Sequence, residues 1–347
     1  MKILYAIQGT GNGHVCRAKE VIPHLKKHGE LDLLVSGIQA DLNLPFEVKY
    51  AFRGMSFVFG KKGGIDLLNT YMKNHLHSFM KEVKSLPIEQ YDLVINDFEP
   101  ISAWAANLKN KACVALSNQC AILSDEIPKP KKEDMIGKFI LHHYAPSTTD
   151  YGFHYQPYAP HIFTPIIRSE IRKLKPSNQG HYTVYLPAYD SKYIVEKLCM
   201  IEGVEWQIFA KNLKKAYHFK NAKVYPVDGK LFLESMVSAE GVVCAAGFGT
   251  SSEALFLNKK LLVIPQKLQY EQQCNATALK KMGIPIVKHL RKKQLPKIKK
   301  WIEEGKVISV NYPDQTALIV ETIINNECYK NDNYLDYLIS SQYNIAD

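Results

Sequence analysis

The sequence opens on a short apolar run that passes into a glycine-rich turn: KILYAIQ at residues 2–8, GTGNG at residues 9–13, then His14. The apolar run has the length of a buried strand. From His14 to about Lys27, apolar residues recur at helical spacing, and Gly29 then predicts the end of that helix. Glycines between a strand and a helix let backbone N–H groups approach an anion at the helix N-terminus. The stretch therefore predicts the first strand, turn and helix of an α/β domain.

The same order of strand, turn and helix recurs along most of the chain. Apolar runs of strand length alternate with helix-period segments from Leu31 to Ser117 and again from Tyr182 to Met282, which favours βαβ units around parallel sheets. Residues 120–158 carry several prolines and little periodicity, so we expect loops there. The 347 residues exceed what one hydrophobic core usually supports. We therefore predict two α/β domains, with a boundary near residues 168–180.

The composition is that of an ordinary globular protein. Hydrophobic residues make up 46% of the chain and charged residues 22%, which excludes disordered, collagen-like and coiled-coil proteins. No apolar run approaches the roughly 18–20 residues of a membrane span, and the run after Met1 is too short for a signal peptide. The 7 cysteines include no Cys-x-x-Cys pair and indicate neither a disulfide framework nor a zinc ribbon. We expect a reduced, cytoplasmic protein.

The net charge of +10 suits an anionic partner, which could be a nucleic acid, a membrane face or a phosphorylated small molecule. No aromatic-interleaved nucleic-acid module is present, and we expect no nucleic-acid partner. Residues 54–62 place aromatic side chains beside lysines, which is typical of a loop that docks on an anionic membrane surface. A strand followed by a lysine-bearing turn would give the same pattern. Peripheral contact with the inner face of the membrane is therefore one hypothesis.

The first glycine turn does not fit the common nucleotide-binding signatures. A dinucleotide fingerprint needs a third glycine where this chain has His14, and an acidic residue where it has Ser36. A Walker loop fails as well, because no Gly-Lys-Ser/Thr follows. What remains is a loop that can hold a phosphate or an acceptor through Gly11, Asn12 and Gly13 while it presents an imidazole.

Three polar side chains are candidates for chemistry beside this turn. The helix macrodipole disfavours an imidazolium in a first turn, so we expect His14 to stay neutral and able to accept a proton, unless it has no task. Arg17 lies one turn on, either as a clamp for an acceptor phosphate or carboxylate or in a structural ion pair. Asp97 ends a predicted strand and either orients the His14 ring or, with Glu99, caps the helix that Pro100 opens.

A second glycine-rich turn, AAGFGTSSE at residues 245–253, again joins a strand to a helix. Gly247, Gly249 and the hydroxyls that follow offer donors suited to a diphosphate. Glu253 lies at capping-box spacing from the first of these hydroxyls, or it accepts hydrogen bonds from a ribose. Residues 265–276, PQKLQYEQQCNA, then crowd amides and a glutamate around a helix start. Such side chains match the hydroxyl pattern of a sugar.

Together these motifs resemble the GT-B glycosyltransferases, and most closely those similar to the bacterial enzyme that adds N-acetylglucosamine to lipid I (glycosyltransferase family 28). The motifs are GxGxGH in the first turn, DFEP at residues 97–100, GFGTSSEAL from residue 247 and IPQKLQYEQQxNA from residue 264. The resemblance implies two Rossmann-like domains with parallel sheets that face each other across a cleft. It also implies inverting, metal-independent transfer of a hexose from a nucleotide-sugar, above all a UDP-sugar, to an acceptor hydroxyl. The product that we expect from the resemblance is a cell-envelope glycan or glycolipid.

The resemblance further implies which parts of the chain bind the acceptor and the donor. Residues 1–168 would form the acceptor domain, residues 169–325 the donor domain, and residues 326–347 a helix that crosses back to the first domain. His14 would deprotonate the acceptor hydroxyl. Asn12 departs from the lipid I enzyme, which has two consecutive glycines before its histidine, so acceptor binding does not carry over. The donor-binding residues that the resemblance implies are Gly247, Phe248, Gly249, Thr250, Glu253, Gln269, Glu271, Gln272 and Ser191.

No cofactor or metal is expected, because the chain has no Asp-x-Asp and its paired histidines are poorly spaced for ligation. Two alternatives stay open. A nucleotide-sugar epimerase of the same architecture would need several carboxylates for acid–base chemistry, and Asp97, Glu99 and Glu271 could supply them. A non-catalytic nucleotide-sugar-binding protein is the other alternative, because the argument for catalysis depends on His14.

Overall fold

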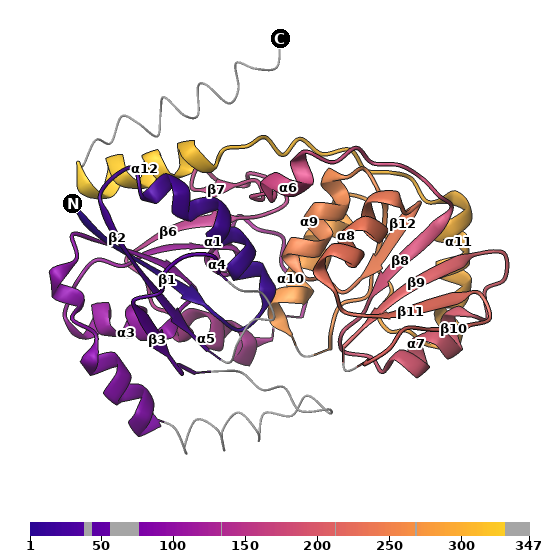
Figure 1. Ribbon diagram of the computed structural model, residues 1–347, viewed down its shortest axis with the longest axis horizontal. Coiled ribbons are helices and arrows are strands. Elements are labelled where there is room, and N and C mark those ends of the chain that lie inside the picture. Colours follow the sequence, from indigo (N-terminus) through magenta and orange to yellow (C-terminus); the bar gives the residue numbers. More distant parts are fainter. Residues whose placement is uncertain (38–43, 56–75, 133, 212, 268, 330–347) are drawn as a thin grey trace, which may run out of the picture. The chain divides into compact units, whose positions relative to one another are not determined.

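The computed structural model divides into two compact units (Figure 1). Unit 1 comprises Met1–Ile127, Asp134–Arg168 and the chain from Pro313 on, and unit 2 comprises Pro128–Glu133 and Ser169–Tyr312. The return at Pro313 comes before the residue-326 boundary that the sequence suggests. The predicted helix over residues 326–347 lies almost entirely outside the described residues. The structure describes residues 1–37, 44–55, 76–132, 134–211, 213–267 and 269–329.

The described strands of unit 1 form one parallel sheet in the order β3-β2-β1-β4-β5-β6-β7. The strands are β1 (Lys2–Gln8), β2 (Glu30–Ser36), β3 (Tyr50–Phe52), β4 (Leu93–Asp97), β5 (Val114–Ser117), β6 (Thr149–Phe153) and β7 (Ile162–Phe163). The helices of unit 1 include α1 (Asn12–Leu25), η1 (Ile88–Gln90), α3 (Pro100–Leu108), α4 (Asn118–Leu123), α5 (Met135–Tyr144) and α12 (Thr316–Cys328), and residues 76–85 are helical as well.

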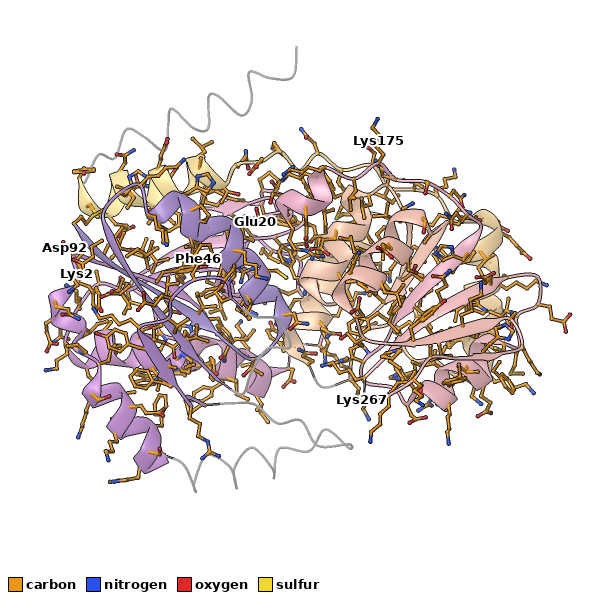
Figure 2. The ribbon with its side chains drawn as sticks, viewed as in Figure 1. Lys2, Glu20, Phe46, Asp92, Lys175 and Lys267 are labelled. Atoms are coloured by element: carbon orange, nitrogen blue, oxygen red, sulfur yellow. The ribbon has the colours of Figure 1, made fainter. Side chains whose placement is uncertain are left out.

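The centre of this sheet is the predicted first strand. Ile3 to Gln8 of β1 are buried, as expected of a parallel strand with neighbours on both edges. At the start of the strand, the backbone N–H of Lys2 donates to Asp92 Oδ2 at 2.6 Å, which ties β1 to the entry of β4 (Figure 2). Strand order reverses between β1 and β4, and in open α/β sheets such a switch point is where ligands bind, beyond the carboxyl ends of the strands.

Unit 2 repeats the arrangement. Its described strands run in the order β10-β11-β9-β8-β12-β13, parallel except for the edge pair β10 and β11. They are β8 (His181–Tyr185), β9 (Glu205–Ala210), β10 (Tyr217–Phe219), β11 (Ala222–Pro226), β12 (Gly241–Cys244) and β13 (Lys260–Val263). The helices are α6 (Ser169–Arg172), α7 (Ser191–Leu198), α8 (Gly229–Ser238), α9 (Phe248–Phe256), α10 (Tyr270–Lys281), η2 (Lys292–Gln294) and α11 (Leu295–Glu304).

The core of unit 2 lies between the sheet and helices α7 and α11. Trp206 is fully buried, and the ring of Tyr182 contacts both Trp206 and Trp301, with centroids 5.6 and 5.2 Å away. Aromatic rings bury much apolar area each and favour these tilted arrangements. The switch point of this sheet lies between β8 and β12, the strands that lead to α7 and to the second glycine turn.

The expectation of loops over residues 120–158 is wrong. The structure places most of α4, all of α5 and β6 there. Helix α5 buries Leu141 and Tyr144 but leaves Met135 and Phe139 more than half exposed, so its apolar residues do not mark one buried face. A helical stripe could not be read from such a pattern.

Candidate functional site

The glycine turn after β1 places His14 in the first turn of α1. Gly11 precedes the helix with φ of 105°, a conformation that glycine adopts without steric cost, and no side chain caps the helix there. The backbone N–H groups of the first turn of α1 therefore do not donate to a capping side chain. His14 is 9% exposed. The helix start thus presents a largely buried imidazole together with backbone donors.

Asp97 lies beside His14 because its strand is the neighbour of β1, with Ile7 opposite Asp97. The His14 Nδ1 atom is 2.7 Å from Asp97 Oδ1, and the carboxylate is fully buried. An ionised carboxylate accepts hydrogen bonds, so in the neutral ring the proton is on Nδ1 and the lone pair is on Nε2. Arg17 Nη2 also lies 3.1 Å from Nδ1, and with this tautomer it donates to the carboxylate instead of the ring. A ring held in this tautomer is able to act as a general base through Nε2.

Arg17 completes this cluster from the next turn of α1. Its guanidinium donates to Asp97 from Nε at 2.8 Å and from Nη2 at 2.5 Å, and stacks over the Phe153 ring at 5.3 Å. Burial alone would raise the pKa of Asp97, but the positive charge of Arg17, with His14 and the hydrogen bonds from both, lowers it. Asp97 is therefore ionised at neutral pH. Of the two alternatives for Arg17, the geometry favours the structural ion pair over the acceptor clamp.

Glu99, and not Asp97, caps the helix that follows. Its carboxylate accepts from the backbone N–H groups of Ile101 and Ser102 at 2.7 and 2.6 Å and from Ser36 Oγ at 2.5 Å. Burial raises the pKa of Glu99. Because Glu99 accepts the hydrogen bonds of the first N–H groups of α3, Asp97 is not needed as the cap of that helix. Of the two roles that the sequence allowed for Asp97, the structure therefore supports the contact with His14 and not the helix cap.

Phe98, which sequence reasoning missed, connects this cluster to a cavity. It has a left-handed backbone with φ of 55°, which is uncommon for a bulky residue and is found near functional sites. Its ring is stacked near His14, with centroids 6.4 Å apart, and contacts Tyr144 at 4.8 Å. Phe98 belongs to the DFEP motif at residues 97–100, but a sequence motif does not show a left-handed backbone or a ring contact.

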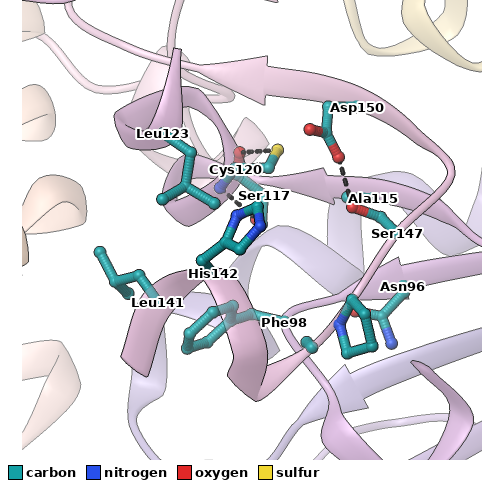
Figure 3. A pocket seen from close by; sticks show the side chains of 12 residues that line it. Asn96, Phe98, Ala115, Ser117, Cys120, Leu123, Leu141, His142, Ser147 and Asp150 are labelled. Carbon is teal, nitrogen blue, oxygen red and sulfur yellow. Dashed lines mark hydrogen bonds between the residues drawn. The ribbon is translucent and has the colours of Figure 1, made fainter. Parts of the chain in front are cut away.

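The cavity beside Phe98 has a volume of about 140 Å³ and lies among β4, β5, α4, α5 and the approach to β6 (Figure 3). One part of its wall is apolar, with Phe98, Leu123 and Leu141, and another is polar, with Asn96, Ser117 and Asp150. A second cavity of about 280 Å³ shares Cys120, Leu123, His142 and Asp150 with it. Together they form a small amphipathic site within unit 1.

In unit 2, the second glycine turn lies at the end of β12. Helix α9 begins at Phe248 after Gly247, and no side chain caps this helix start, which is a place where anions commonly bind. No atom lies within 4 Å of a Cβ placed on Gly247 or Gly249, so the turn faces open space. Because the helix begins before Thr250, the capping-box alternative for Thr250 and Glu253 does not hold.

The amide-rich segment is held close to this turn. Asn275 of α10 donates from Nδ2 to the carbonyl oxygen of Ala246 at 3.0 Å. Gln272 uses its Oε1 to accept from the backbone N–H of Gln266 at 2.9 Å, which shapes the loop after β13. Gln269 is the residue before α10, and Glu271 lies in its first turn and is partly exposed. Ser191 begins α7, after β8, the strand next to β12.

Neither a metal centre nor a membrane span is seen in the part of the chain that the structure describes. Within residues 1–37, 44–55, 76–132, 134–211, 213–267 and 269–329, no three His, Cys, Asp or Glu side chains are grouped to hold a metal ion. None of the helices in those ranges is long and apolar enough to cross a bilayer.

Solved structures with the same fold are glycosyltransferases and a related enzyme. UGT89C1 from Arabidopsis thaliana, complexed with UDP-L-rhamnose, has a TM-score of 0.57 and 12% identity over 98% of each chain. The glycosyltransferase SnogD from Streptomyces nogalater has a TM-score of 0.50 and 12% identity, over 93% of this chain and 99% of its own. A proposed UDP-N-acetylglucosamine 2-epimerase from Listeria monocytogenes has a TM-score of 0.56 and 11% identity, over 95% and 97%.

These similarities show the GT-B fold, with two α/β units on parallel sheets. No curated protein sequence matches the chain. The sequence model of a known family, described as glycosyl transferase family 1, matches residues 1–304. Since that match covers most of the 347 residues, the chain belongs to glycosyl transferase family 1.

Proposed function

We propose that this protein transfers a sugar from a nucleotide-sugar to an acceptor hydroxyl, with inversion at the anomeric carbon and without a cofactor or metal. The observation that carries the proposal is the buried His14–Asp97 pair, whose hydrogen bond of 2.7 Å orients the ring so that Nε2 is the proton acceptor of the neutral imidazole. A family membership alone does not assign a base, whereas this pair is a ready acid–base dyad.

In the proposed reaction, His14 Nε2 takes the proton of the acceptor O–H while the acceptor oxygen attacks the anomeric carbon. The bond from that carbon to the diphosphate oxygen breaks, and the nucleoside diphosphate leaves with the bonding electron pair. A single displacement of this kind inverts the configuration. Asp97 stays ionised throughout and stabilises the imidazolium that forms. The glycosylated acceptor, the released nucleoside diphosphate and the proton on His14 account for all the atoms of the two substrates, and His14 then gives that proton to solvent.

The second glycine turn is the proposed site of the diphosphate. The positive end of the α9 dipole stabilises the charge of the leaving group, and Gly247 and Gly249 leave room for it. We place the ribose at Glu253 and the sugar hydroxyls at Glu271 and Gln272. The base we propose is uracil, because UGT89C1 was solved with UDP and with UDP-L-rhamnose.

The cavity beside Phe98 is the proposed site for part of the acceptor. Its apolar wall suits a ring or hydrocarbon face, and its serine, asparagine and aspartate suit hydroxyl groups. UGT89C1 was also solved with the polyphenol quercetin, which has both features. Lipid I as the acceptor, a role in the cell envelope, and a cytoplasmic or membrane-bound location stay predictions. Residues 56–62 of the predicted membrane loop lie outside the described residues.

The epimerase is the second candidate, since a proposed epimerase shares the fold. Two of the carboxylates that it would need are already engaged, however. Asp97 is paired with His14 and Arg17, and Glu99 caps α3 in full burial. The third carboxylate that the sequence suggested for this chemistry, Glu271, lies in unit 2 at the start of α10. The geometry therefore favours transfer.

The test uses purified protein with a panel of UDP-, dTDP- and GDP-sugars and an acceptor library that includes polyphenols and glycolipids. We expect nucleotide release that depends on the acceptor, and NMR should show that the product anomer is inverted. His14→Ala should abolish release while calorimetry shows unchanged donor binding, and His24→Ala in the last turn of α1 is the matched control. Interconversion of sugar isomers would support the epimerase, and binding without turnover would support the non-catalytic protein.

A further inference from the structure

The edge of the unit 2 sheet has a surface that the proposed reaction does not use. From Trp206 to Val227 the chain contains 5 lysines and no aspartate or glutamate. Every residue from Lys214 to Lys220 is exposed, and these residues include the edge strand β10. We call residues 214–220, together with Met200, the β10 edge. Such a run of one sign of charge creates a positive field at this margin of the sheet.

Large apolar side chains lie within this basic surface. Tyr217 is 37% exposed and Phe219 is 48% exposed. Being two residues apart, they point to the same face of β10, and the residues opposite them on β11, Val224 and Ala222, belong to the core. The aromatic pair therefore continues the apolar face of the sheet beyond the point where helices cover it. Met200, which is 47% exposed, follows Cys199, whose Sγ lies 3.6 Å from the carbonyl oxygen of Phe219.

The β10 edge is fixed to the rest of unit 2. Cys199 Sγ lies 3.6 Å from the carbonyl oxygen of Phe219, which brings the end of α7 to the hairpin. Asn221 donates from Nδ2 to the carbonyl oxygens of Ile201 and Val204 at 2.9 and 2.7 Å. Lys220, in the hairpin turn, has φ of 50°, where glycine or asparagine is the usual residue. The hairpin thus holds a lysine at its tip in a defined position.

Acidic groups near the β10 edge offset little of its charge. Glu205 Oε1 is 2.8 Å from Lys223 Nζ, so that carboxylate neutralises a lysine of β11. Glu202 is exposed on the loop between α7 and β9. The lysines at positions 211, 214, 215 and 220 keep a positive excess around the two aromatic rings.

We propose that the β10 edge docks unit 2 on an anionic lipid surface. Lysines beside exposed tyrosine and phenylalanine are the combination that binds lipid headgroups while rings enter the interface. A nucleic-acid site would favour arginine, and residues 206–227 contain none. This surface is separate from residues 54–62, and its function does not depend on the proposed transfer.

The experiment is co-sedimentation of the full-length protein with phosphatidylcholine vesicles, with and without phosphatidylglycerol, at low and high salt. We expect binding to the anionic vesicles that weakens with salt. The Lys214→Glu/Lys215→Glu variant should bind about thirtyfold more weakly or worse, since each lysine near a surface contributes about fivefold. Tyr217→Ala/Phe219→Ala should weaken binding at high salt most, because ring insertion is not screened.

The matched control is Lys299→Glu/Lys300→Glu on α11, which changes the net charge equally at two exposed lysines of the same unit. Thermal melting and turnover of each variant confirm that it is folded. The proposal is overturned if the anionic vesicles do not bind, or if the control weakens binding as much as the β10-edge variant does. Two other outcomes would also overturn it, if vesicle binding is unchanged in the edge variants. One is that these variants no longer bind a single-stranded oligonucleotide, and the other is that they no longer form a dimer detected by light scattering.

Discussion

Replacement of Asp97 by asparagine tests the acid–base dyad most directly. The asparagine has the same shape, but its amide carries no charge and offers Nδ2 as a donor. If that group faces His14, Nδ1 becomes the acceptor and the proton moves to Nε2, where it blocks the base. If the amide oxygen faces His14 instead, the tautomer is kept but the charge that stabilises the imidazolium is gone. Both orientations therefore slow the chemical step.

The size of the effect follows from the geometry. Unit charges about 4 Å apart in a partly polar site attract by about 4 kcal/mol at an effective dielectric constant of about 20. The His14–Asp97 contact of 2.7 Å places the two charge centres in that range. Because the imidazolium forms as the proton is taken, most of this energy belongs to the transition state. We expect kcat to fall by about 10²–10³, which corresponds to about 3–4 kcal/mol.

Asp97→Asn also leaves Arg17 without its counter-charge. Arg17 is 8% exposed, so the variant should lose about 3–5 kcal/mol of stability, as buried pairs do when one partner is removed. Steady-state kinetics are therefore combined with thermal melting and with donor binding by calorimetry, at a temperature where the variant is folded. The matched control is Asp92→Asn, because Asp92 directly precedes the first residue of β4 whereas Asp97 is its last residue. A folded Asp97→Asn variant with wild-type kcat would refute the reasoning.

Three further predictions concern stability and donor binding. Glu99→Ala removes three buried hydrogen bonds and should lower the free energy of unfolding, measured by chemical denaturation, by about 2–4 kcal/mol. The kcat of the folded fraction should be unchanged, and a large loss of kcat would contradict the assignment of Glu99 as a helix cap. Gly249→Ala should leave the melting temperature the same or higher but raise the donor KM about tenfold, because the added methyl group enters the open space in front of α9 where we propose the diphosphate. An unchanged KM would mean that the diphosphate binds elsewhere. Burial lowers the pKa of His154 to about 3, so below pH 6.5 the unfolded chain binds a proton at this residue that the folded chain does not bind. The free energy of unfolding should therefore fall by about 1 kcal/mol per pH unit as the pH is lowered from 6.5 toward 3. His154→Phe should remove that part of the slope, and equal slopes for both proteins would show that His154 is not responsible.

The sequence by itself determined the strand–turn–helix order and the two motifs on which the site depends. Strand β1 spans Lys2–Gln8 as predicted, and strands and helices alternate between Tyr182 and Met282 as predicted, although the edge strand β10 and helix α11 were not. These elements could be predicted because a buried parallel strand is a short apolar run, and because glycines mark the turn that follows it. Helix α5 was missed because its apolar residues are distributed over exposed and buried positions.

Only the tertiary structure decided what the polar residues do. Asp97 and Glu99 are both acidic residues at a helix start, so the sequence could not tell the cap from the partner of His14. The hydrogen bonds of Glu99 to Ile101 and Ser102 settle the cap, and the pairing of β4 with β1 brings Asp97 to His14 from 83 residues away. The physical reason is that local periodicity records which face of an element is buried, whereas the partners of a buried charge are set by strand order, which brings distant residues to the same edge of the sheet.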